Sequence, residues 1–193
     1  PGDNIIRPGW SGGANWWGAA FDPDTQRLFV PSWAHFSTVN ISPPEASDSD
    51  LMIRPRVRDL SGPRGLPLFK PPYSQLVAFD MNKGEKLWHV PVGEGPRDHA
   101  DLQGLELPPM GNFEKLGGPL LTKTLLFIGQ GFETNRLGVY DKDSGKELWW
   151  MQLPARFHSA PITFMVKGKQ YIVLALGGGA RGETEQLMAL ALP

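Results

Sequence analysis

The sequence predicts an all-β fold built from repeated four-stranded antiparallel sheets, and three observations support this. First, one pattern occurs twice, at residues 78–88 and 139–149: an apolar residue is followed by Asp two positions on, Gly six on and Trp ten on. Second, short alternating apolar runs separated by turns recur along the chain. Third, 23 Gly, 19 Pro and 7 Trp among 193 residues suit strands and tight turns better than a helical bundle.

The repeated pattern has the chemistry of a tight hairpin. An Asp side chain hydrogen-bonds to its own turn, and Gly adopts the positive φ that such a turn needs. The Trp lies on the returning strand, where it is a large block for packing. Two copies at the same internal spacing therefore predict a repeat architecture in which each unit packs against its neighbours.

Composition excludes several classes of function. The formal net charge is −1, and no basic stripe is present, so we expect no nucleic-acid partner. The absence of Cys excludes disulfides, thiolate metal sites and covalently attached haem within this sequence. No apolar run is long enough to span a membrane, and a hydrophobic content of 40% suffices for a packed core.

The first part of the chain predicts one hairpin and one long insertion. Residues 1–12 are expected to form a loop, and residues 13–22 and 27–33 two antiparallel strands around a turn. Residues 34–72 then interrupt the strand pattern with Pro-rich and charged stretches. A connection of this length is either functional or a solvated surface excursion, and we expect it to lie over one face of the sheet stack.

The remaining chain predicts further hairpins in the same rhythm. The first Trp pattern lies within two strands over 74–92, and a loop follows at 93–116. The later expected elements are hairpins over 118–130, 137–153 and 161–175, and a final strand over 187–192.

The last stretch also admits a different interpretation. Residues 177–182 match the dinucleotide-binding pattern GxGxxG, and residues 183–192 are good helix formers. The repeat instead requires a strand, with Met188, Leu190 and Leu192 on one face. We expect the strand, because an isolated GxGxxG match is weak evidence without a second parallel strand and an acidic ribose ligand.

The candidate functional segment is Gly12-Gly13-Ala14-Asn15-Trp16-Trp17-Gly18. An amide such as that of Asn15 can donate a hydrogen bond to a carbonyl oxygen that gains negative charge. Flanking glycines allow the backbone to come close to a bound group. A structural Asn at the start of a strand, beside core tryptophans, is the alternative.

This segment and several others resemble the PQQ-dependent quinoprotein dehydrogenases of the glucose and alcohol dehydrogenase type. The similarity extends to residues 70–73, 117–120, 161–164 and 168–173, and the repeated Trp pattern resembles the tryptophan-docking motif of that family. The resemblance implies an eight-bladed β-propeller in which each docking Trp packs between neighbouring blades. In that fold, residues 1–193 would form its C-terminal part, with about three four-stranded blades at 13–92 (with the insertion), 117–152 and 159–193, the last lacking its outer strand.

The resemblance also implies a function. It identifies Asn15, and secondarily Trp16, as contacts to the cofactor pyrroloquinoline quinone (PQQ). The expected enzyme oxidises a sugar or alcohol hydroxyl in the periplasm and passes electrons to a membrane quinone or a cytochrome c. It uses calcium or another hard cation, whose ligands we expect outside this chain together with the catalytic base. We therefore assign no catalytic residue and no metal ligand here. Leu116 departs from the pattern, since many alcohol-oxidising members carry Trp before the paired glycines.

Two alternatives remain at this point. A non-catalytic propeller scaffold that presents loops to protein partners would also keep the docking motifs, although it has no need for an amide at Asn15. Asp98, His99 and Asp101 form the other candidate, either a polar cluster near the channel mouth or an ordinary solvated loop.

Overall fold

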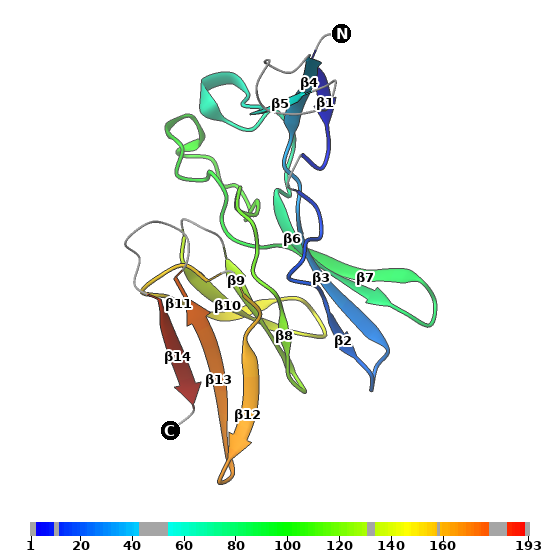
Figure 1. The fold of residues 1–193 in the computed structure, drawn as a ribbon, viewed down its shortest axis with the longest axis vertical. Helices are drawn as coiled ribbons and strands as arrows, with labels where there is room; N and C mark the ends of the chain where they lie inside the picture. Colours follow the sequence, from blue (N-terminus) through cyan, green and yellow to red (C-terminus); the bar gives the residue numbers. More distant parts are fainter. Residues whose placement is uncertain are drawn as a thin grey trace.

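The structure is a computed structural model that describes residues 3–9, 12–42, 54–130, 134–157, 159–177 and 185–191. These residues form four antiparallel sheets, arranged as in Figure 1. We call three of them the first, second and third sheets in chain order, and the fourth the insertion sheet. The all-β prediction is confirmed. No helix in the described part of the chain is long and apolar enough to cross a membrane.

The first sheet has the strand order β2-β3-β6-β7. Its strands are β2 at Ala20–Asp22, β3 at Arg27–Trp33, β6 at Ser74–Asp80 and β7 at Glu85–Pro91. The first Trp pattern forms the predicted β6–β7 turn, in which Asp80 Oδ1 accepts a hydrogen bond from Asn82 N at 2.9 Å and Gly84 has φ +70°.

The second sheet repeats this arrangement in the order β8-β9-β10-β11. Its strands are β8 at Leu120–Leu121, β9 at Leu125–Gln130, β10 at Arg136–Asp141 and β11 at Glu147–Gln152. The second Trp pattern forms the β10–β11 turn, with Ser144 N donating to Asp141 Oδ1 at 2.8 Å and Gly145 at φ +72°. The two copies of the sequence pattern thus form equivalent turns in successive sheets.

The third sheet contains three described strands in the order β12-β13-β14. They are β12 at Ile162–Val166, β13 at Lys169–Leu176 and β14 at Gln186–Ala191. The predicted final strand is confirmed: Met188 and Leu190 pack on the core, and Leu192 lies outside the described residues. Pairing with β13 outweighs the helix propensity of this stretch, so the strand-turn-helix context of a dinucleotide site is absent from the described residues.

The insertion forms a small sheet, which the sequence did not predict. Its order is β1-β4-β5, with β1 at Asn4–Ile6, β4 at Ser37–Ser42 and β5 at Arg54–Asp59. Residues 1–12 are therefore not loop throughout, because Asn4, Ile5 and Ile6 pair with β4. A short 3₁₀ helix, η1 at Pro63–Gly65, follows. Figure 1 shows this sheet at one end of the molecule, beyond the other three.

The core consists of two apolar clusters, one on each face of the second sheet. The first cluster joins the first and second sheets and includes Phe29, Leu76, Leu126 and Ile128. The second joins the second and third sheets through residues that include Phe127, Leu137, Val139, Leu174 and Leu176. Alternate residues of β9 thus enter opposite clusters, as expected for a strand covered on both faces.

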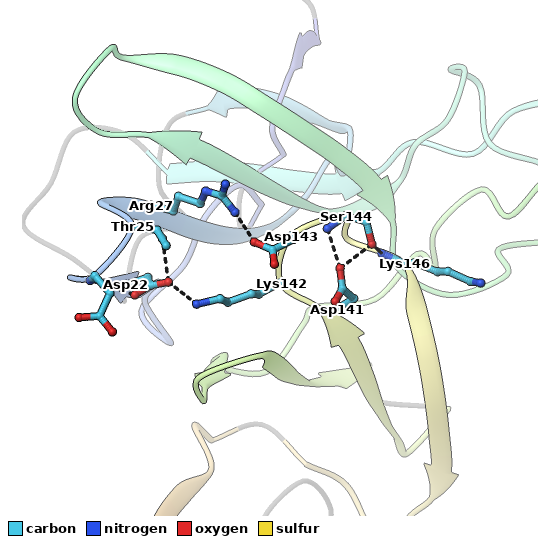
Figure 2. Close-up of polar contacts among 9 residues, drawn as sticks. Asp22, Thr25, Arg27, Asp141, Lys142, Asp143, Ser144 and Lys146 are labelled. Carbon is cyan, nitrogen blue, oxygen red and sulfur yellow. Dashed lines mark hydrogen bonds and ion pairs between the residues drawn. The ribbon is translucent and has the colours of Figure 1, made fainter.

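The β10–β11 turn fastens the second sheet to the first (Figure 2). Lys142 Nζ lies 2.6 Å from Asp22 Oδ2, and both side chains are buried. Asp143 pairs with Arg27 at 2.5 Å. The hydrogen bond from Lys142, with others from Thr25 and the backbone of Asp24, lowers the pKa of Asp22 to about 2. The same turn thus makes two charged contacts with the end of β2 and the start of β3.

The indole of Trp88 rests on the same turn. A Cβ built on Gly145 would lie 2.7 Å from Trp88 Cε3, so only Gly allows this close approach. The Trp88 ring also lies 5.9 Å from that of Phe29. The first docking Trp therefore packs between two sheets as expected. The second does not in this chain, since Trp149 is 54% exposed.

Candidate cofactor site

The segment before β2 forms a tight turn, although the sequence predicts one strand over 13–22. Gly13 pairs with Trp33 through an isolated bridge, in which Gly13 N donates to Trp33 O at 2.9 Å. The chain then turns, and Gly18 N donates to Asn15 O at 3.0 Å. Gly13 and Gly18 have φ of +101° and +78°, which interrupts the extended backbone, so the strand is confined to β2.

Asn15 is held by its own turn. Its Oδ1 accepts a hydrogen bond from Trp16 N at 2.8 Å. This hydrogen bond orients the carboxamide so that its oxygen faces the backbone of the turn. The Nδ2 group has no hydrogen-bond partner among the residues that the structure describes. Asn15 is therefore oriented with a donor available.

Asn15 lines a small recess between the segment before β2, the end of β3 and the segment before β8. The recess is formed by Gly13, Asn15, Trp17, Gly18, Pro31, Ser32, Trp33 and Leu116. None of these lining residues is charged, and two are tryptophans. His35 stacks on Trp33 with a ring-centroid distance of 4.9 Å. The recess thus combines flat aromatic and glycine surfaces with the amide of Asn15 and the hydroxyl of Ser32.

The two neighbouring tryptophans have different surroundings. Trp16, the second predicted cofactor contact, is 97% exposed and does not line the recess. Trp17 does line it. Trp17, Ser32 and Trp33 were not singled out from the sequence. The hairpin register could not have suggested Trp33, because it pairs Ala20 with Phe29 and, if extended, would place Gly13 opposite Phe36. The turn at 15–18 shifts the pairing of Gly13 to Trp33.

Leu116 occupies the position at which the family resemblance leads us to expect Trp in many members. It is 6% exposed, pairs with Gln130 through an isolated bridge and belongs to the first core cluster. Because it also lines the recess, it gives that side a branched aliphatic surface in place of a flat ring.

The polar cluster at 98–101 has a structural role in the described chain. His99 Nδ1 accepts a hydrogen bond from Asp101 N at 3.1 Å and caps the 3₁₀ helix η2 at Ala100–Leu102. Asp101 also pairs with Arg64 of η1 at 2.9 Å. The cluster thus ties the 93–116 loop to the insertion. Within the described ranges, no group of three or more His, Cys, Asp or Glu residues could hold a metal ion.

Sequence comparison relates the chain to quinoprotein dehydrogenases. Residues 2–172 match the family described as glucose/ethanol/alcohol dehydrogenase, β-propeller domain. A probable quinate dehydrogenase (quinone) of Xanthomonas campestris pv. juglandis is 29% identical over 96% of this chain and 26% of its own length. The quinoprotein glucose dehydrogenase of Escherichia coli K12 is 33% identical over 68% of this chain and 17% of its own length.

Structural comparison supports the same fold. The quinohemoprotein alcohol dehydrogenase ADHIIG of Pseudomonas putida HK5 matches with a TM-score of 0.65 and 24% identity, over 92% of this chain and 24% of that one. The chain spans about a quarter of the length of the quinate dehydrogenase that it matches. Since the family match covers most of the sequence, the chain belongs to the glucose/ethanol/alcohol dehydrogenase β-propeller family.

Proposed function

We propose that this chain is part of a PQQ-dependent dehydrogenase that oxidises a sugar or alcohol hydroxyl, and that the recess at Asn15 forms one wall of its PQQ site. The observation that carries the proposal is the amide of Asn15, which lines the recess with its oxygen engaged by Trp16 N and its NH₂ group without a partner among the described residues. Membership of a dehydrogenase family supports this function over a non-catalytic scaffold.

The residues of the recess fit a flat orthoquinone. Carbonyl oxygens require hydrogen-bond donors, and Asn15 Nδ2 is one. Planar rings pack well against other planar groups, and Trp17 and Trp33 line the recess. Gly13 and Gly18 allow a bound group to approach the backbone. The exposed indole of Trp16 remains a candidate for stacking on the cofactor from outside the recess.

PQQ, if bound here, would supply the hydride acceptor for the substrate carbon. Asn15 would then donate a hydrogen bond to a quinone oxygen, and such a bond is stronger when its acceptor carries negative charge. The backbone N–H of Trp16 holds the Asn15 carboxamide in the orientation that presents NH₂ and not oxygen.

We propose the other parts of the enzyme from the family resemblance alone. They are a calcium or another hard cation that polarises the quinone, a carboxylate base, and a membrane quinone or a cytochrome c as electron acceptor in the periplasm. Two relatives are named for quinate and glucose, which is consistent with a hydroxyl-bearing substrate. We assign neither the base nor the cation ligands to residues of this chain.

The test is turnover of the complete protein that carries this chain, measured with added PQQ and calcium. We expect Asn15→Ala to fold normally and to lose about a hundredfold in turnover, because one donor to a developing oxyanion contributes roughly 3 kcal/mol. Asn15→Asp should be worse, since an ionised carboxylate cannot donate and repels the reduced quinone.

The matched control is Asn82→Ala, in the exposed β6–β7 turn, where the backbone N–H of Asn82 donates to Asp80 and its side chain has no hydrogen bond to the described residues. This variant should keep full turnover. Near-normal turnover in Asn15→Ala would remove Asn15 from the site.

A further inference from the structure

Three chain segments from three different sheets meet at Gly118. This residue lies just before β8, whereas Trp17 precedes β2 and Ala160 precedes β12. A Cβ built on Gly118 would lie 2.7 Å from the carbonyl oxygen of Trp17, 2.8 Å from Ala160 Cβ and 3.0 Å from Ala160 Cα. Real Cβ atoms are essentially never found closer than 3.0 Å to another heavy atom, as the first two contacts would be. The Trp17 carbonyl oxygen is a backbone atom that cannot rotate away.

The junction connects directly to the turn that carries Asn15. Trp17 lies inside the turn that is closed by the hydrogen bond from Gly18 N to Asn15 O. Asn15 and Trp17 both line the recess. Trp17 is only two residues after Asn15 in the chain. A displacement of the Trp17 carbonyl would therefore shift the turn that carries Asn15 and change the position of its amide in the wall of the recess.

The neighbouring glycine has different contacts. A Cβ on Gly117 would lie 3.2 Å from Ser159 O and 3.4 Å from Gly129 Cα, and Trp17 is not among its nearest neighbours. Neither glycine has a φ in the left-handed region, so an added methyl group acts through space and not through backbone strain. Gly117→Ala and Gly118→Ala therefore add the same methyl group at adjacent positions, but only the methyl group at 118 would contact the Asn15 turn.

We infer that Gly118 is a positioning residue for the Asn15 site: the absence of a side chain there lets the entry segments of three successive sheets pack together and sets the place of the Asn15–Gly18 turn. This inference rests on the proposed PQQ site. It assigns to Gly118 a role in cofactor binding that the direct contacts of the recess do not include, because Gly118 does not line it.

The experiment measures the Kd for PQQ in the complete protein by titration of tryptophan fluorescence, with calcium present, alongside the melting temperature. We expect Gly118→Ala to weaken PQQ binding at least tenfold. Gly117→Ala should keep the wild-type Kd within about twofold even where it lowers the melting temperature, since the measured Kd refers to folded protein at a temperature below both transitions.

A double variant separates the two contacts of Gly118. Ala160→Gly in the Gly118→Ala background removes the clash with Ala160 Cβ and leaves the one with the Trp17 carbonyl. We expect the double variant to retain the raised Kd. If the double variant recovered wild-type affinity in full, the effect of Gly118→Ala would not arise from its clash with the Trp17 carbonyl. An unchanged Kd in folded Gly118→Ala would overturn the inference as a whole.

A second measurement applies if Gly118→Ala does not fold. Hydrogen exchange of the wild-type protein should slow on PQQ binding both at residues 15–18 and at 117–118, because the two segments are in contact. Protection of the first segment alone would contradict the inference. Failure of the wild-type protein to bind PQQ at all would instead contradict the proposed function.

Discussion

At the scale of single residues, the buried pair of Asp22 and Lys142 holds the first and second sheets together. Replacing Lys142 by Met leaves the Asp22 carboxylate with its bonds to Thr25 and the backbone only. We expect a loss of about 2–4 kcal/mol, since breaking a buried pair leaves an uncompensated charge. Lys146→Met changes an exposed Lys in the same turn and should cost no more than about 0.5 kcal/mol. The free energies of unfolding of Lys142→Met and Lys146→Met can be compared with that of wild type by thermal unfolding of the complete protein.

The pH dependence of the same pair gives an independent check. The pKa of Asp22 is lowered from 3.8 to about 2 in the folded protein, so the unfolded state binds the proton more readily. The stabilisation is therefore present in full above pH 3.8 and is lost as the pH falls toward 2. Asp22→Asn should be less stable than wild type near neutral pH, and this difference should shrink over that range. If the stability difference between wild type and Asp22→Asn stayed constant down to pH 2, the ion pair with Lys142 would not be its source.

At the scale of structural elements, the docking of β7 onto the β10–β11 turn rests on Trp88. We expect Trp88→Ala to cost about 2–4 kcal/mol, somewhat less than a fully buried Trp because this one is only partly covered. Trp88→Phe should cost clearly less, since a ring remains over Gly145 and the buried indole Nε1 has no hydrogen-bond partner among the described residues. Equal losses in the two variants would show that ring packing is not the source of the stability.

The elements that follow a repeat could be predicted from the sequence, and those that depend on local exceptions could not. Both Trp turns were predictable because Asp and Gly at fixed positions determine the turn. β14 was predictable because the repeat requires a strand at this position, although its residues favour helix. The break in the strand over 13–22 depends on positive φ at Gly13 and Gly18, which composition alone does not reveal. The insertion sheet pairs residues far apart in the chain, and no local pattern indicates such pairing.

The candidate site was predictable only in part. Asn15 was found through a family pattern, and its place in the recess agrees with that prediction without testing the role. The pair of Asp22 and Lys142 was missed because it is not part of the repeat: the turn equivalent to Lys142-Asp143 carries Met81-Asn82. The role inferred for Gly118 depends on three segments that meet only in the folded chain.

At the scale of the whole molecule, the first strands of the three sheets begin together at one end. β2 contacts β8, and the segments before β8 and β12 meet at Gly118. The recess with Asn15 lies at this end, and the ion pair of Asp22 with Lys142 lies at the other end of β2. Because the stabilising ion pair and the proposed cofactor site lie at opposite ends of β2, variants of the ion pair should lower the melting temperature without changing the Kd for PQQ.

The most direct test of the central claim is an experimental structure of the complete protein with PQQ and calcium bound. We expect Asn15 Nδ2 to lie within hydrogen-bonding distance, about 2.7–3.2 Å, of a quinone oxygen, with its Oδ1 still accepting from Trp16 N. A cofactor bound with its quinone oxygens remote from Asn15, or a carboxamide turned so that its oxygen faces the quinone, would contradict the proposed role of Asn15.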